Sequence, residues 1–251
     1  MILSRRKLIG IGAAGAGGLL LGGCDRLNQT EGFRDGLKGA TGLNQRVHRL
    51  LVGDSLAREF SEADISPVFK PNGSIAVADP AYRAHLAQGF ASWALRIDGL
   101  VRQPLMLPLG ALKAMPQRSQ ITRHDCVEGW SAIGKWQGPQ LGAVLALAGL
   151  LPEARYAVFH CADMLEGAPY YESIDLVEAF HPQTILAWRM NDAPLSEPHG
   201  APLRLRVERQ LGYKQAKYVM RIELTASLDG LYGGNGGHWE DARGYQWYAG
   251  I

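Results

Sequence analysis

The chain has 251 residues, of which 47% are hydrophobic and 20% are charged, and its formal net charge is +2. This length allows one sizeable core or at most two small domains. Removal of residues 1–23 would leave 23 basic and 24 acidic residues, and a near-neutral body gives no electrostatic reason to expect a nucleic acid as partner. The three cysteines are Cys24, Cys126 and Cys161, and the sequence contains no CxxC pair, HExxH motif or GxxxxGK[ST] loop.

The first 24 residues are predicted to be an export signal rather than part of the fold. Ser4-Arg5-Arg6-Lys7-Leu8-Ile9 is a twin-arginine pattern, and a 14-residue apolar run follows from Leu8 to Leu21. A membrane span needs about 20 apolar residues, so this run is short. Leu21-Gly22-Gly23-Cys24 resembles a lipobox. We therefore expect export to the periplasm and a tether to the inner membrane through lipidated Cys24; a short membrane anchor and an uncleaved leader are the alternatives.

Residues 25–65 are predicted to form a linker followed by short helices. The stretch from Asp25 to Asn44 is polar and rich in glycine, which is typical of a linker. From Gln45 to Phe60, apolar and charged residues alternate irregularly, which indicates one or two short surface helices. One domain is then expected over residues 66–251.

Alternating and periodic patterns predict the elements of this domain. Phe90–Ile97 alternates like a half-buried strand, and Asp98-Gly99 is a hairpin turn signal. Further strands are expected at Ile121–Arg123, Tyr156–Phe159, Thr184–Met190 and Val219–Leu224, and helices at Leu109–Met115, Leu141–Leu150 and Leu176–Phe180.

The segment from Ile121 to Trp136 concentrates side chains that carry chemistry. Cys126 follows a predicted strand end, and Glu128-Gly129 then breaks the strand pattern. A fixed backbone that holds a thiol over a pocket suits a metal ligand or a nucleophile, because the thiolate is the reactive form. A buried, inert thiol explains the same pattern. A disulfide between Cys126 and Cys161 is a further alternative, which export would permit.

Three other segments carry groups that bind anions or form turns. Phe69–Ser74 contains Pro-Asn-Gly, which makes turns unaided. Pro198–Arg204 ends on an arginine, whose guanidinium matches phosphate. Leu211–Lys217 places two lysines on a glycine-containing turn, which is reasonable chemistry for an anion site but is also common surface decoration.

Arg-His-Asp-Cys-Val-Glu-Gly-Trp-Ser at residues 123–131, followed by Lys-Trp-Gln-Gly-Pro-Gln-Leu at 135–141, resembles the molybdenum-cysteine segment of the sulfite oxidase family of molybdopterin-dependent oxidoreductases. The similarity is to the bacterial branch of periplasmic methionine-sulfoxide reductases, and it runs from about Phe69 to the C-terminus. The resemblance implies an α+β fold of the sulfite oxidase type, with mixed β-sheets and peripheral helices.

The resemblance also implies roles for particular residues. Cys126 would be catalytic as the ligand of a molybdenum ion held by a pterin dithiolene, and Tyr245 is the candidate active-site tyrosine, with Tyr248 next. The residues implied to bind the cofactor are Phe69, Asn72, Cys161, Asp163, Ser173, His199, Arg204, Lys214, Gln215 and Lys217.

The function implied is a two-electron oxygen-atom transfer on a small or protein-bound sulfur or oxo substrate. A membrane b-type cytochrome is the implied redox partner, and the twin-arginine machinery, which carries folded proteins, is the implied export partner. Sulfite oxidases place several arginines around their anion, whereas Arg123 is the one close to Cys126 here, which puts sulfite in doubt. The alternatives are a tethered pterin-binding module without catalysis and a thiol enzyme with His124, His160 or His199 as base.

Overall fold

The computed structural model describes residues 30–251, without the side chains of residues 31–41. The twin-arginine pattern, the apolar run and Cys24 therefore lie outside the described residues. The chain divides into two compact units, residues 1–53 and 54–251. The second unit thus begins 12 residues before the domain start that we expected at residue 66.

The first unit contains one long helix, α2 (Glu31–Val52), where we expected a linker as far as Asn44. Its apolar residues recur every three or four positions, at Phe33, Leu37, Ala40, Leu43, Val47 and Leu50. This is the spacing of one helix face, and the glycines at positions 36, 39 and 42 obscured it. The helix ends at Gly53, whose N–H donates to the Arg49 carbonyl. Within residues 30–251, no helix is both long enough and apolar enough to cross a membrane.

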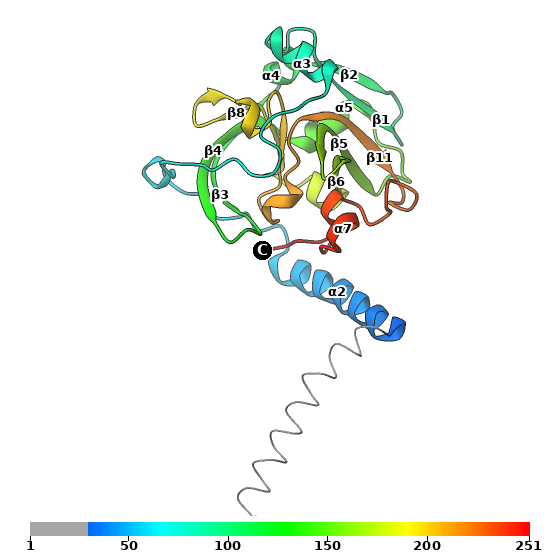
Figure 1. Cartoon of the computed structure of the whole chain (residues 1–251). Helices are drawn as coiled ribbons and strands as arrows, with labels where there is room; N and C mark the ends of the chain where they lie inside the picture. Colours follow the sequence, from blue (N-terminus) through cyan, green and yellow to red (C-terminus); the bar gives the residue numbers. More distant parts are fainter. Residues whose placement is uncertain (1–29) are drawn as a thin grey trace, which may run out of the picture. The chain divides into compact units, whose positions relative to one another are not determined.

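The largest sheet of the second unit has five strands (Figure 1). In spatial order they are β2 (Leu105–Pro108), β1 (Ala94–Gly99), β11 (Val219–Thr225), β5 (Tyr156–Leu165) and β6 (Ala168–Asp175). β1 and β11 run parallel, while the other neighbouring pairs are antiparallel. β1 and β2 form a hairpin, as expected, but Asp98 and Gly99 are the last two residues of β1, and the turn is residues 100–104.

Two smaller sheets complete the strand content of the described residues. One contains β3 (Gln117–Asp125), β4 (Ser131–Pro139), β8 (Arg189–Met190) and β9 (Ala193–Pro194), and the other pairs β10 (Arg204–Arg206) with β7 (Ile185–Ala187). β3 and β4 stay in register from Gln117↔Pro139 to Asp125↔Ser131. This hairpin places residues 126–130 in its turn.

Short helices lie at the connections. They are α3 (Pro80–Ala87), α4 (Leu109–Ala114), α5 (Leu141–Ala148), α6 (Leu176–Ala179) and α7 (His238–Arg243), with single 3-10 turns η1 (Glu62–Asp64), η2 (Glu197–His199) and η3 (Gly212–Lys214). α4, α5 and α6 confirm the predicted helices to within two residues.

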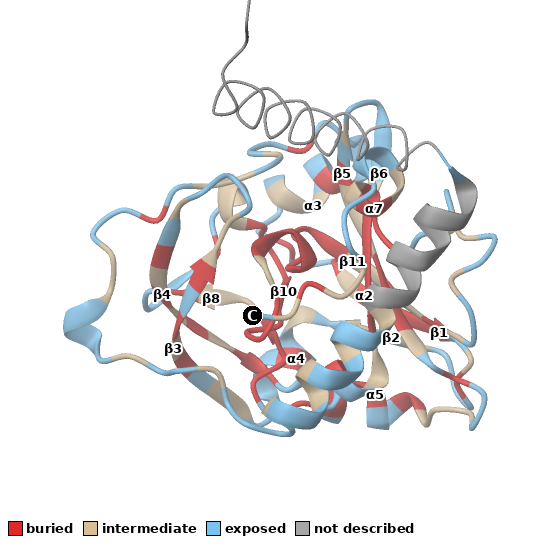
Figure 2. Cartoon of the chain, turned by 90° about the horizontal axis from the view of Figure 1, so that it is seen from below, coloured by how far each residue is buried: buried red, intermediate tan, exposed pale blue. Residues whose placement is uncertain are grey.

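The segment between β10 and β11 runs through the interior of the unit. Residues 207–218 are buried at all but one position, and Figure 2 shows the buried residues concentrated along β10, β11 and the chain around them. Several of these residues are charged or amide side chains, namely Glu208, Arg209, Gln210, Lys214, Gln215 and Lys217. Because buried polar groups are costly without partners, this segment demands hydrogen bonds, ion pairs or a ligand.

Several strands differ from their predicted bounds. The single strand predicted at Thr184–Met190 is divided into β7 and β8, which belong to different sheets. β1 begins four residues after Phe90, which has a positive φ of 62° and lies in a turn. β5 continues to Leu165, and its pairing with β6 shifts register between His160 and Met164. Cys161 and Asp163 therefore lie in a bulged strand rather than at a strand end.

Gly138 of β4 allows β7 to approach closely. A β-carbon here would overlap the backbone of Leu186 and lie 2.9 Å from the Cα of Ala187. We expect Gly138→Ala to lower the free energy of unfolding by about 1–3 kcal/mol, because overpacking is destabilising. Gly110→Ala in α4 is the matched control, since a β-carbon there meets nothing within 4 Å. Urea unfolding measures both, and equal midpoints for the two variants would contradict the close approach.

Candidate functional site

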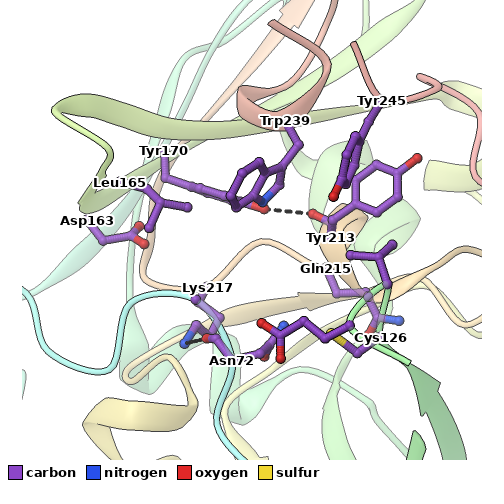
Figure 3. Close-up of a pocket in the computed structure, with 14 residues that line it drawn as sticks. Asn72, Cys126, Asp163, Leu165, Tyr170, Tyr213, Gln215, Lys217, Trp239 and Tyr245 are labelled. Carbon is purple, nitrogen blue, oxygen red and sulfur yellow. Dashed lines mark hydrogen bonds between the residues drawn. The ribbon is translucent and has the colours of Figure 1, made fainter. Parts of the chain in front are cut away.

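A cavity lies among the β3–β4 turn, residues 72–73, β5, β6, η3, and α7 with the segment after it. Figure 3 shows that its two sides differ. The polar side carries Asn72, Cys126, Gln215 and Lys217, and the aromatic wall consists of Tyr170, Tyr213, Trp239 and Tyr245. A cavity with a few polar groups opposite apolar surface is typical of a small-molecule site.

The turn of the β3–β4 hairpin fixes the backbone of Cys126. Its N–H donates to the Trp130 carbonyl at 2.9 Å, and its carbonyl accepts from the Gly129 N–H at 3.1 Å. Gly129 has a φ of 85°, which glycine adopts without strain. Burial raises the pKa of the Cys126 thiol. Cys126 and Cys161 are both free thiols, so the structure does not contain the disulfide considered above.

Two arginines of β10 approach the ring of Trp136. Alternate residues of a strand share a face, and the guanidinium carbons of Arg204 and Arg206 lie 4.8 and 4.2 Å from the ring centroid. Arg206 forms a buried ion pair with Glu208, with contacts of 2.9 and 2.6 Å. Both arginines are buried. They differ in whether a carboxylate pairs with the guanidinium.

Arg204 lacks a carboxylate partner in the described part of the chain. Its Nη1 donates to the His199 carbonyl at 3.0 Å, while its Nε has no hydrogen-bond partner. Burial and the neighbouring charge of Arg206 lower the pKa of Arg204 to about 9. Burying an unpaired cation is costly, and a guanidinium fork is suited to phosphate or carboxylate. An anionic ligand would therefore complete this site.

His124 offers a second unused donor beside the cavity. Its Nδ1 lies 3.1 Å from Nη1 of Arg206. A guanidinium can only donate, so Nδ1 accepts and the proton of the neutral ring lies on Nε2. Burial, with Arg206 and Arg204, lowers the pKa of His124, which keeps the ring neutral. Nε2 has no partner among the described residues, and it lies 2.5 Å from the point where a β-carbon on Gly212 would sit.

Lys217 brings a positive charge to the polar side. Its ammonium donates to the carbonyls of Asn72 at 2.6 Å, of Pro198 at 3.0 Å and of Ser74. These bonds hold the loop at residues 72–74 against the cavity. Burial and the charge of Arg204 lower the pKa of Lys217 to about 7, so an anion in the cavity would favour its charged form.

The structure brings half of the predicted site residues in the described range to the cavity. These are Asn72, Cys126, Asp163, Gln215, Lys217 and Tyr245. Phe69 and His199 lie behind them, where Nε2 of His199 donates to the Phe69 carbonyl at 3.0 Å. With Arg204, they support the polar side rather than line it.

Three predicted cofactor residues point elsewhere. The ammonium of Lys214 is buried between Glu172 and Glu240. Ser173 donates to the Gly236 carbonyl and accepts from Nε1 of Trp247 at 2.8 Å, so it fastens the C-terminal segment. The Cys161 thiol faces the Phe159 carbonyl of its own strand at 3.9 Å, and burial raises its pKa. The structure gives these side chains partners within the protein and does not support their contact with a cofactor.

Other lining residues were not singled out from the sequence. Tyr170, Tyr213 and Trp239 come from three separate segments, and no local pattern joins them. Glu128 also lines the cavity, and a hydrogen bond from Nε1 of Trp130 lowers its pKa. The sequence feature that could have identified Glu128 is its position two residues after Cys126.

Arg123 lies outside this cavity. Its Nε pairs with Asp125 at 2.9 Å, and both side chains line a second cavity. They belong to the face of β3 opposite to His124, as the alternation of a strand requires.

Comparisons with known proteins give a consistent family. The model of the "Oxidoreductase molybdopterin binding domain" matches residues 83–230. The putative protein-methionine-sulfoxide reductase subunit YedZ1 of Azospira oryzae is 43% identical over 160 residues, which are 64% of this chain and 56% of that protein. The protein-methionine-sulfoxide reductase catalytic subunit MsrP of Campylobacter jejuni is 32% identical over 156 residues, which are 56% of this chain and 52% of that protein. The chain thus spans about half the length of these relatives.

A solved structure shares the fold. The crystal structure of the sulfane dehydrogenase SoxCD from Paracoccus pantotrophus superposes with a TM-score of 0.50 at 23% identity, over 55% of this chain and 39% of that chain. Together with the mixed sheets described above, this similarity confirms the predicted α+β fold class.

Measurements of unfolding stability can test whether the charge of Arg204 lacks a counterion. In protein purified without a bound ligand, we expect Arg204→Met to leave the free energy of unfolding unchanged or to raise it, because a costly buried charge is removed. Arg209→Met is the comparison: Arg209 pairs with buried Glu178 at 2.9 Å, and its loss should cost about 3–5 kcal/mol. Urea unfolding measures both. A larger loss for Arg204→Met would contradict the view that Arg204 lacks its anion.

Proposed function

The chain belongs to the oxidoreductase molybdopterin binding domain family, and we propose that it is the catalytic subunit of an exported molybdenum enzyme that reduces sulfoxides, including methionine sulfoxide in proteins. Family membership makes it an oxidoreductase of the sulfite oxidase type. Two observations support the proposed substrate: the relatives are named as protein-methionine-sulfoxide reductases, and the chemistry of the cavity suits a sulfoxide.

The residues around the cavity fit an anionic pterin. Arg204 is a buried cation with an unused donor, and His124 presents an unused N–H at Gly212. The side chains of Gln215 and Asp163 also line the cavity, Gln215 beside His124 and Asp163 beside Ser74. Buried polar atoms are rarely left unpaired, and this set combines positive charge with both donors and acceptors. The unpaired Arg204 is the observation that carries the proposal.

When bound, the cofactor supplies two-electron oxygen-atom transfer, which turns a sulfoxide, two electrons and two protons into a thioether and water. Cys126 would hold the metal as a thiolate. Because burial raises the pKa of the free thiol, metal binding would release its proton. The hairpin turn keeps the thiol in place, and Lys217 and His124 would hold the anionic part of the pterin.

The aromatic wall supports an apolar sulfur substrate. The rings of Trp239 and Tyr245 stack at 5.8 Å, and Tyr213 meets Tyr245 edge-on at 5.1 Å. Thioether sulfur makes favourable contacts with aromatic rings. Sulfite would instead require clustered cations, and Arg123 pairs with Asp125 outside the cavity.

The proposals of export and of a membrane redox partner are based on the sequence. The twin-arginine pattern and the lipobox-like Cys24 support export of the folded, loaded protein and a tether on the periplasmic side of the inner membrane. A membrane-bound b-type cytochrome would then supply the electrons.

The thiol-enzyme alternative finds little support in the geometry. Each candidate base already has another partner: His124 meets Arg206, His160 lies 2.9 Å from Glu223, and His199 bonds Phe69. The non-catalytic binding module would keep the same anion site, so turnover must separate it from an enzyme.

Replacement of Cys126 tests the proposal directly. In a host that makes the cofactor, the wild type should contain molybdenum near one per chain and reduce methionine sulfoxide with an artificial electron donor. We expect Cys126→Ser to lose at least about 100-fold in turnover, because a metal ligand is removed. Cys161→Ser is the control, since its thiol faces its own strand. Folded wild-type protein without molybdenum, or full turnover by Cys126→Ser, would refute the proposal.

Tyr245 lines the cavity on its aromatic wall, and we expect its hydroxyl to supply a proton to the product oxygen. Tyr245→Phe should lower kcat by about 100-fold or more with little change in KM, as expected for loss of a general acid. Tyr248→Phe, in the same segment but outside the cavity lining, should behave as wild type. Steady-state kinetics decides the matter, and an unchanged kcat in Tyr245→Phe would remove this role.

A further inference from the structure

Three charged side chains are buried together behind the aromatic wall. They are Glu172 of β6, Lys214 of η3 and Glu240 of α7, here called the buried triad. Nζ of Lys214 lies 2.6 Å from Oε2 of Glu172 and 2.5 Å from Oε1 of Glu240. One ammonium therefore bridges two carboxyl groups from distant parts of the chain.

The two remaining carboxyl oxygens face one another. Oε1 of Glu172 and Oε2 of Glu240 have no hydrogen-bond partner. Both lie within 2.6 Å of the point where a β-carbon on Gly237 would sit. Glycine at position 237 thus leaves room for two carboxyl groups that share a small, buried space.

The charges of the triad do not balance if both carboxyl groups are ionised. The surrounding titratable groups are Tyr170 and Tyr171 on β6, Cys161 on β5, Tyr213 on η3, and His238 and Asp241 on α7. None of these groups carries a permanent positive charge. A buried net negative charge is costly, and like-charged carboxyl groups in contact favour retention of a proton by one of them. Burial raises the pKa of Glu172, and the charge of Glu240 raises it further.

We propose that the buried triad holds one proton between Glu172 and Glu240, and that this proton keeps α7 and the aromatic wall in place. Each member is close in sequence to a residue of the wall. Glu240 follows Trp239, Lys214 follows Tyr213, and Glu172 lies two residues after Tyr170 on the same face of β6. His238 of α7 also stacks on Tyr170 at 5.4 Å. Glu172, Lys214 and Glu240 are thus positioning residues for the site, and the inference depends on the proposed function solely for its effect on substrate.

The position of α7 then depends on pH. If α7 leaves, the two carboxyl groups separate and meet water, so the raised pKa of Glu172 returns to its ordinary range and docking of α7 takes up a proton. As pH rises above the ordinary carboxyl range, docking weakens by up to about tenfold per pH unit, until the raised pKa of the pair is passed. Burial would raise the pKa of Asp241, but hydrogen bonds from Tyr171 and two backbone N–H groups lower it, so Asp241 stays ionised near neutral pH.

Amide hydrogen exchange of residues 238–243 in the loaded, full-length protein tests this inference. Between about pH 5.5 and 8.5, and after correction for intrinsic exchange, the wild type should lose protection by up to about tenfold per pH unit. Glu240→Gln replaces the carboxyl group with a neutral amide, so its protection should not depend on pH. Lys214→Met should lose protection at neutral pH, because two carboxyl groups then face each other without a cation.

Two control variants separate the triad from other causes. Arg243, which is on α7, forms an exposed ion pair with Glu166 at 2.7 Å. Arg243→Gln breaks this pair and should keep the wild-type dependence of protection on pH. His238→Gln, which removes the histidine of α7 that stacks on Tyr170, should also keep the wild-type dependence of protection on pH. Protection of the wild type that does not change with pH would overturn the inference. The inference would also be overturned if the dependence of protection on pH disappeared in His238→Gln but persisted in Glu240→Gln.

A second readout links the triad to substrate. KM for methionine sulfoxide should rise with pH in the wild type and stay constant in Glu240→Gln, with smaller changes in kcat. If exchange follows the prediction but the protein has no sulfoxide turnover, the triad stands and the proposed substrate fails. If turnover is present and KM follows pH equally in both proteins, the triad does not position the wall.

Discussion

The buried guanidinium of Arg204, which has no carboxylate partner among the described residues, is the constraint on which the site depends. Its neighbour Arg206 is neutralised by the carboxylate of Glu208, whereas Arg204 has no such counterion. The Nε of Arg204 is unpaired, next to Lys217 and near the unused N–H of His124. A folded protein tolerates such a cost where a ligand removes it. An anionic cofactor would therefore contribute to stability as well as to chemistry, which suits a protein that we propose is loaded before export.

The two sides of the cavity are built by different means. The polar side rests on backbone geometry: a hairpin turn fixes Cys126, and Lys217 joins three backbone carbonyls. The aromatic wall comes from β6, η3, α7 and the segment after α7, and the first three of these meet through the buried triad. Cys126, the proposed metal ligand, thus belongs to the part with the more continuous backbone pairing. The wall, which would contact substrate, is held by side chains whose charge can change.

Local pattern was sufficient for elements whose residues interact with near neighbours. The strand that ends before Cys126 and the helices α4, α5 and α6 were predicted from alternation and periodicity, whereas β4, which completes the hairpin around Cys126, was not. The resemblance to a known family also located Asn72, Gln215 and Lys217. The direction in which the Lys214 side chain points could not be predicted from local pattern, because its partners Glu172 and Glu240 come from other segments and neither is marked by a motif. Cys161 and Asp163 were misplaced because a β-bulge leaves no clear sequence signal, and the glycines of α2 concealed a helix that its apolar spacing favours.

The central claim is that this set of buried donors and cations holds a pterin whose metal is bound by Cys126. Anomalous diffraction at the molybdenum edge, from crystals of the loaded protein, tests it most directly. The account predicts a molybdenum peak at bonding distance from Sγ of Cys126, with the anionic part of the cofactor hydrogen-bonded to Arg204, Lys217 or His124. A metal peak away from Cys126, or a bound cofactor that leaves all three of these side chains without contact, would contradict the account.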